Sequence, residues 1–168
     1  MPINLTRRAM LAASATFTTL AATGMTARAA GHATHTVEML NTHPEDRRLR
    51  MVYYPRVLKV AAGDTVNFKS VDRGHNSASI DGMIPEGAEE WDSKIGDDVE
   101  VTFNTPGVYG YQCTPHASAG MVGLIIVEGE GMLDNLEAAK GVRQRGRAKK
   151  TFEALWAEAE EQGYLATS

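Results

Sequence analysis

Four side chains of this sequence have the chemistry to hold a soft metal ion. Cys113, His116 and Met121 lie in one short segment, and His75 stands well upstream, directly after a glycine. Together they offer one thiolate, two imidazoles and one thioether, which is the ligand set of a mononuclear copper site that transfers electrons. The sequence therefore predicts one copper ion held by these four residues.

The spacing of these residues carries more information than their types. Alone, a Cys is usually a small buried hydrophobe, a His an ordinary polar residue and a Met a filler of the core. Here a Cys-x-x-His-x-x-x-x-Met segment falls between two expected strands, so its side chains can return to one point. Pro115 stiffens that loop by fixing φ, and Gly120 frees the backbone just before Met121.

The segments around the ligands are typical of short β-strands. Between residues 35 and 127, runs of β-branched and aromatic residues are separated by turn residues, as in a sandwich or a barrel. Residues 64–69 and 98–103 alternate between apolar and polar side chains, which predicts half-buried strands. Residues 121–128 are almost all apolar and predict a strand in the middle of the packing, directly after the ligand loop.

The last part of the chain has the periodicity of helices. Residues 133–139 form a short amphipathic segment, and residues 147–162 place apolar side chains at intervals of three and four. The members of that stripe are Phe152, Leu155, Trp156 and Ala159. We expect the stripe to pack on the sandwich. The basic segment 140–150 between the two helices could bind an anionic surface, but a solvated pair of helix ends is the favoured interpretation.

The N-terminal 29 residues have the features of an export signal. Arg7 and Arg8 precede an uncharged stretch, and the chain then reaches a small-x-small pattern that ends at Ala29, where we expect cleavage. A twin-arginine route and an ordinary secretory route both remain open. Serines and threonines dilute the stretch, which disfavours a membrane anchor. The expected organisation is a signal at 1–29 and one domain at 30–168, with the sandwich at about 35–128 and the helical tail at about 132–163.

Charge and cysteine content narrow the function further. The chain has a net charge of −4, and its acidic excess lies after the expected signal, which disfavours a nucleic-acid-binding protein. Cys113 is the single cysteine, so an exported protein of this sequence has no internal disulfide, and its thiol must be buried or bound. We expect His32 and His35 to lie in an N-terminal tail and assign no function to them or to His43.

The sequence resembles the cupredoxins and, among them, the pseudoazurins. The resemblance covers residues 37–41, 58–66, 73–76, 82–89, 106–109, 113–116, 120–123 and the two closing helices. It implies an all-β Greek-key β-sandwich with two C-terminal α-helices, and a type 1 blue copper ion bound by His75, Cys113, His116 and Met121. It also implies that Asn76 joins the His75 segment to the cysteine loop and donates a backbone N–H toward the sulfur of Cys113.

The resemblance further implies how electrons enter and leave. The ring edge of His116 would lie at the surface within an apolar patch, and basic side chains would steer an acidic partner toward it. The implied docking residues are Met83, Ile84, Pro85, Pro115, Arg73 and Lys94. The implied partners are copper nitrite reductase or another denitrification enzyme, together with a cytochrome-type donor. We also expect the protein to be a periplasmic monomer with no membrane anchor. Gln112 and Asp92 depart from the pattern, because they stand where the family usually has lysines.

Three other chemistries are open to the same residues. A thiol enzyme would use Cys113 as the nucleophile and a His as the base, but the sequence offers no obvious oxyanion group. A copper-delivery protein would expose its ligands, whereas here two strands and a Pro-containing loop would clamp them. A zinc site would rarely include a thioether. We therefore expect an electron carrier and not an enzyme.

Overall fold

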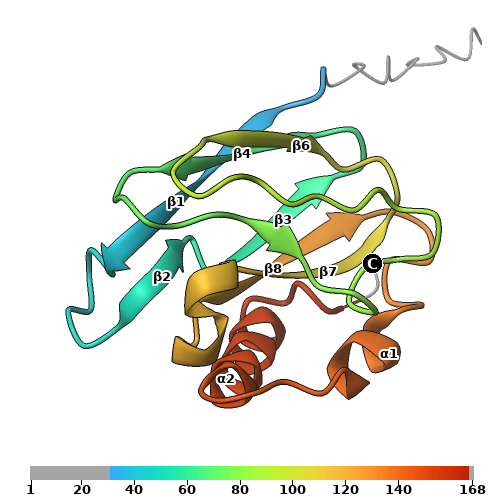
Figure 1. Cartoon of the computed structure of the whole chain (residues 1–168). Coiled ribbons are helices and arrows are strands. Elements are labelled where there is room, and N and C mark those ends of the chain that lie inside the picture. The colour runs from blue at the N-terminus through green and yellow to red at the C-terminus, as the bar shows by residue number, and fades with distance from the viewer. Residues whose placement is uncertain (1–30, 167–168) are drawn as a thin grey trace, which may run out of the picture. The chain divides into compact units, whose positions relative to one another are not determined.

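The computed structural model describes residues 31–166, and their strands form two four-stranded sheets (Figure 1). The first sheet has the strand order β2-β1-β4-β6 and the second has the order β3-β8-β7-β5. The strands are β1 (Thr34–Thr42), β2 (Arg50–Tyr54), β3 (Val57–Ala61), β4 (Thr65–Ser70), β5 (Ala78–Ser79), β6 (Val99–Thr102), β7 (Gly107–Gln112) and β8 (Val122–Glu128). The predicted sandwich is confirmed, and the nearly all-apolar segment 121–128 forms β8 in the interior of its sheet.

Inward-facing residues of both sheets make up the core of the sandwich. Val66 and Phe68 of β4 are fully buried, as the alternation in that segment predicted. Phe68 meets Tyr111 of the other sheet edge to face, with 5.0 Å between the ring centroids. The two sheets are therefore held together by interlocking aromatic and aliphatic side chains.

Strand register brings distant parts of the sequence to one end of the sandwich. β7 and β8 are antiparallel, and their register ends with Gln112 opposite Val122, so the chain leaves and re-enters the sheet at Cys113 and Met121. β1 and β4 are parallel, which carries the end of β1 to the loop that follows β4. The loop after β4 contains His75.

Two helices cover the outer face of the second sheet. α1 spans Leu136–Gly141 and α2 spans Ala148–Glu161. The ends of both helices lie within three residues of the ends predicted for segments 133–139 and 147–162. Phe152, Leu155 and Ala159 of α2 are buried in an apolar cluster with Leu124 and Ile126 of β8. This confirms the predicted packing stripe, in which each buried Leu or Phe contributes roughly 1.5 to 3 kcal/mol.

The start of the described chain is attached to the sandwich by a buried carboxylate. Asp64 accepts hydrogen bonds from the backbone N–H groups of Ala33 at 2.7 Å and Ala61 at 3.0 Å, and its Oδ2 lies 2.8 Å from Nε2 of His35. The expectation of a tail is therefore wrong for His35, which lies inside β1. The expected export signal lies outside the described residues. Across residues 31–166, helices that combine the length and the apolar character needed to cross a membrane are absent.

Candidate metal centre

Three of the predicted ligands converge at the end of the sandwich where β7 passes into the loop before β8. Nδ1 of His75 lies 3.2 Å from Nδ1 of His116, and Sγ of Cys113 lies 3.8 Å and 3.4 Å from these two nitrogens. A search of residues 31–166 for His, Cys, Asp and Glu side chains close enough to hold a metal ion finds His75, Cys113 and His116. The cluster joins a loop after β4 to a loop after β7.

The separations within the cluster fit the radius of a transition-metal ion. A metal bound about 2.0 Å from nitrogen and about 2.3 Å from sulfur holds ligand atoms roughly 3.3 to 3.8 Å apart. The distances between the donor atoms of His75, Cys113 and His116 fall in or close to this range. A thiolate with two imidazoles is the donor set that copper accepts, so these residues fit a copper ion both in size and in chemistry.

Backbone hydrogen bonds close the cysteine loop on itself. The loop contains the 3₁₀ helix η1 (Thr114–Ala119), which ends at Gly120 with φ of 99°. Cys113 N–H donates to the carbonyl of Met121 at 3.0 Å, and Met121 N–H donates to the carbonyl of His116 at 3.1 Å. Met121 is fully buried, as is Cys113. The loop thus brings the backbone of all three of its predicted ligand residues together.

A side chain that the sequence analysis missed orients His75. Oδ1 of Asn41 lies 3.0 Å from Nε2 of His75, so the imidazole donates there and leaves Nδ1 free toward Cys113 and His116. Asn41 is held in turn by Asp72, whose carboxylate accepts its backbone N–H at 2.7 Å. The sequence carries no clear signal for this contact, because it arises from the parallel pairing of β1 with β4, which places Asn41 beside the loop that contains His75.

Asn76 connects the two ligand-bearing loops. Its Oδ1 accepts the backbone N–H of Thr114 at 2.7 Å, and its Nδ2 donates to the hydroxyl of Thr114 at 3.1 Å. The same Nδ2 also lies 3.1 Å from Oδ1 of Asp92 and 3.1 Å from the carbonyl of Ser93. One buried amide therefore fixes the position of Cys113 relative to its neighbour His75.

Burial sets the protonation of the metal-free site. It raises the pKa of the Cys113 thiol, and backbone N–H groups of Asn76 and His116 oppose that shift. Burial also lowers the pKa of His75, and the nearby His116 acts in the same direction. These shifts favour the neutral thiol of Cys113 and the neutral imidazole of His75, and a bound cation would favour the thiolate.

The predicted docking residues differ in their exposure. Pro115, Arg73 and Lys94 are exposed on loops at the ligand end, where Gly96 N–H bonds the carbonyl of His75 at 2.8 Å. Met83 is only 1% exposed and Pro85 is buried, so a surface role for these two residues is wrong. They fill the space left by glycines of β7, since a Cβ on Gly110 or Gly107 would collide with Met83 or Pro85 respectively. Ile84 is half-buried against the core.

Comparison with known proteins identifies similar chains. Residues 37–128 match the family model described as copper binding proteins of the plastocyanin/azurin family. The chain is 38% identical over 145 residues to the pseudoazurin of Paracoccus pantotrophus, an alignment that covers 86% of this chain and 92% of that protein. It is also 38% identical over 122 residues to the pseudoazurin of Methylorubrum extorquens, covering 73% and 79% respectively. The structure matches a pseudoazurin from Sinorhizobium meliloti with a TM-score of 0.71 and 44% identity, covering 76% of this chain and 97% of that one.

Proposed function

This chain belongs to the pseudoazurins, within the plastocyanin/azurin family of copper-binding proteins, and we propose that His75, Cys113, His116 and Met121 are its copper ligands. It is an electron carrier with a copper cofactor and not an enzyme. The observation that supports the ligand assignment is the convergence of one sulfur and two imidazole nitrogens within 3.8 Å. Met121 would complete the set by offering a weakly binding thioether.

The surroundings of the ligands suit the transfer of single electrons. When bound, copper supplies a one-electron couple between Cu(II) and Cu(I). His75, Cys113 and Met121 are all fully buried, so water is kept away from three of the four ligands. Asn41, Asn76 and the backbone bonds of the cysteine loop hold the ligands in one arrangement. Such a site needs little rearrangement when the oxidation state changes, and electron transfer is accordingly fast.

His116 provides the route to the surface. It is half-buried, whereas the other three proposed ligands are fully buried. Its neighbour Pro115 is exposed and supplies apolar surface beside the ring. A partner that docks on this end of the sandwich therefore comes close to a ligand, which shortens the path of the electron.

The proposed setting is the periplasm, where the protein acts as a monomer. The support is the signal-like sequence of residues 1–29. The proposed acceptor is copper nitrite reductase or another denitrification enzyme, and the proposed donor is a cytochrome. Arg73 and Lys94, exposed at the ligand end, would attract an acidic surface on such a partner.

A titration with Cu(II) tests the ligand assignment. One equivalent of Cu(II) added to the protein should produce intense thiolate-to-copper absorption bands in the visible region, and reduction should bleach them. Cys113→Ser should abolish these bands while leaving a folded protein. Weak bands in the parent protein, or bands that persist in Cys113→Ser, would contradict the assignment. Loss of copper within minutes to a weak chelator would instead support a delivery protein.

A kinetic experiment tests the docking surface separately. Arg73→Gln and Lys94→Gln should slow the association-limited reduction of purified copper nitrite reductase and flatten its dependence on salt, because charges at the rim of an interface act mainly on the association rate. Lys149→Gln, which removes an exposed charge from α2, is the matched control. Equal effects of all three substitutions would show that net charge, and not this surface, governs the reaction.

A further inference from the structure

The residues at the expected start of the mature chain have the chemistry of a second metal site. Cleavage after Ala29 makes Ala30 the first residue, and Gly31 and His32 follow it. A free N-terminal amine, two backbone amides and the imidazole of a histidine in third position are four nitrogen donors on consecutive residues. Covalent bonds alone let these nitrogens surround one metal ion in fused chelate rings. His32 is not a proposed ligand of the copper centre, so this chemistry is additional to it.

The structure leaves the donors of Gly31 and His32 accessible. Both residues are exposed and precede β1. Within residues 31–166 the backbone hydrogen bonds begin at Ala33, whose N–H donates to Asp64 at 2.7 Å and whose carbonyl accepts the N–H of Thr65 at 2.9 Å. The N–H groups of Gly31 and His32 make no hydrogen bond to the described residues. A metal ion could therefore replace their protons without breaking a bond of the sheet.

The N-terminal residues and the copper centre lie at opposite ends of β1. Asn41, near the last residue of β1, contacts His75, whereas His32 lies two residues before the first. A strand of nine residues is roughly 30 Å long. The ring of His32 lies instead beside Gly63, where an added Cβ would collide with it. A metal ion at the N-terminus would therefore be remote from the proposed copper ligands.

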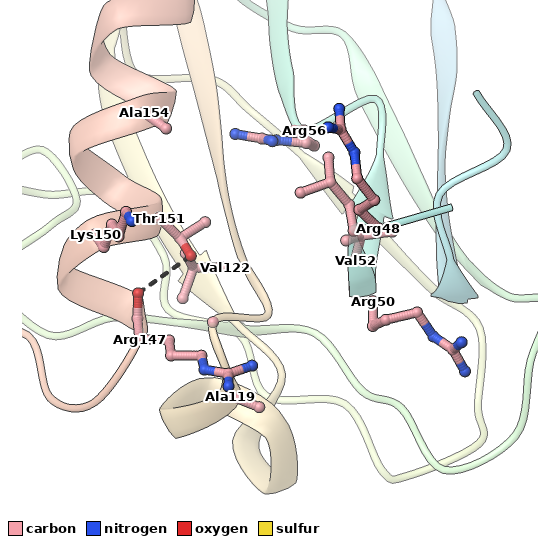
Figure 2. A pocket seen from close by; sticks show the side chains of 12 residues that line it. Arg48, Arg50, Val52, Arg56, Ala119, Val122, Arg147, Lys150, Thr151 and Ala154 are labelled. Carbon is pink, nitrogen blue, oxygen red and sulfur yellow. Dashed lines mark hydrogen bonds between the residues drawn. The ribbon is translucent and has the colours of Figure 1, made fainter. Parts of the chain in front are cut away.

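Side chains elsewhere in residues 31–166 offer no second metal site. The group of three or more His, Cys, Asp or Glu side chains close enough for this is the one at the copper centre. Figure 2 shows the cavity of about 410 Å³ between β2 and α2, and its lining includes no His, Cys, Met, Asp or Glu. A second ion therefore needs donors from the backbone, which an N-terminus can supply.

We propose that the mature N-terminus Ala30-Gly31-His32 binds one Cu(II) ion in a square plane of four nitrogens, with Ni(II) as its spectroscopic substitute. Both ions favour this geometry and these donors. Binding releases the amide protons of Gly31 and His32, and any proton on the amine, to water, so affinity should rise with pH. Cu(I) prefers thiolate and thioether donors, so the site selects the oxidised ion. The proposal rests on the proposed export, because only cleavage after Ala29 frees the amine of Ala30.

Titration of the exported and processed protein with Ni(II) tests the proposal. The mass of the protein first establishes its N-terminal residue. One equivalent of Cu(I), which is colourless, then fills the copper centre, and Ni(II) is added in the absence of oxygen. We expect the absorption band of square-planar Ni(II), and the band should stop growing at one equivalent. Oxidation of the copper in the same sample should then produce the thiolate-to-copper bands, which report on the copper centre separately.

Two substitutions should abolish the Ni(II) band. Gly31→Pro removes a backbone N–H that the chelate requires but keeps the amine and the imidazole, and the space around Gly31 is free for a side chain. His32→Gln removes the imidazole. His43→Gln removes a histidine just beyond the other end of β1, so it is the matched control and should keep the band. Gly31 and His32 are exposed, so their variants should fold, and the thermal transition checks this.

Three results would overturn the proposal. They are the lack of a Ni(II) band in a chain that begins at Ala30, a band that persists in Gly31→Pro, and a processed chain that begins at another residue. The copper centre fails by a different sign, which is the lack of thiolate-to-copper bands after oxidation. If those bands are missing while the Ni(II) band appears, the copper ligands are wrong and the N-terminal site is supported.

Discussion

The hydrogen bond between Asn41 and His75 should contribute measurably to copper affinity, and Asn41→Leu removes it. His75 is fully buried, and the carbonyl oxygen of Asn41, at 3.0 Å, is the acceptor for its Nε2–H. Without that acceptor, the tautomer that leaves Nδ1 free for copper has an unsatisfied buried N–H. In the metal-free protein the ring can escape this penalty by changing its tautomer, so the cost falls mainly on the copper-bound state.

The size of the effect follows from the cost of an unsatisfied buried donor. That cost is about 1 to 3 kcal/mol. At about 1.4 kcal/mol for each factor of ten, copper should bind roughly 5-fold to 150-fold more weakly. This agrees with the loss of about 10-fold to 100-fold that is typical when a group supporting a metal ligand is removed. Asn41→Asp, which keeps an acceptor at the same position, should restore most of the affinity.

Competition with a chelator of known affinity measures the change. Asn67→Leu is the matched control, since it makes the same replacement on β4, and Oδ1 of Asn67 is buried without a hydrogen-bond partner among the described residues. We expect Asn67→Leu to keep the parent affinity. If Asn41→Leu binds copper within twofold of the parent protein, then Asn41 does not hold His75 in the way that the geometry indicates.

Three further predictions concern Met121, the acid stability and the helical tail. Met121→Gln should keep a copper site but lower its reduction potential in voltammetry, because an oxygen donor stabilises Cu(II). An unchanged or raised potential would contradict the assignment of Met121 as a ligand. The hydrogen bond from His35 holds the pKa of Asp64 below its ordinary value, so its stabilisation should be full above about pH 4 and fall away as the pH drops through the folded-state pKa. Asp64→Asn should flatten that acid limb in denaturant titrations, and a parallel pH profile would exclude the carboxylate as its cause. Leu155→Ala should lower the free energy of unfolding by about 2 to 5 kcal/mol, because Leu155 is fully buried between α2 and the sandwich. The control is Ala154→Gly, at an exposed position of the same helix, which should lower the free energy of unfolding by about 1 kcal/mol.

The ligand loop was predictable because its information is local. Cys113, His116 and Met121 lie on one short segment between two strands, so their types and spacing appear directly in the sequence. The helix α2 was predictable for a similar reason, since its buried residues recur at intervals of three and four. In both cases one element contains the whole pattern.

The features that were missed depend on pairing between distant segments. Asn41 reaches His75 only because β1 and β4 pair in parallel, and alternation within a strand does not reveal its partner or its direction. Met83 and Pro85 were expected at the surface, yet glycines at positions 107 and 110 leave room for them beneath the sheet. The absence of a side chain is a weak signal in a sequence, because a strand glycine is equally consistent with a bulge or with a close approach of the backbone.

The helical tail takes part in supporting the metal centre and does not merely cover a sheet. The backbone N–H of Arg147, at the start of α2, donates to the carbonyl of Ser118 in η1 at 2.9 Å. A Cβ on Gly120 would lie 2.7 Å from Oγ1 of Thr151, so α2 packs directly on the residue that precedes Met121. The ligand loop is thus held by Asn76 at its beginning and by α2 at its end. Since Leu155 and Phe152 anchor α2 on β8, the same apolar packing that stabilises the fold also limits the movement of the loop that holds Cys113, His116 and Met121.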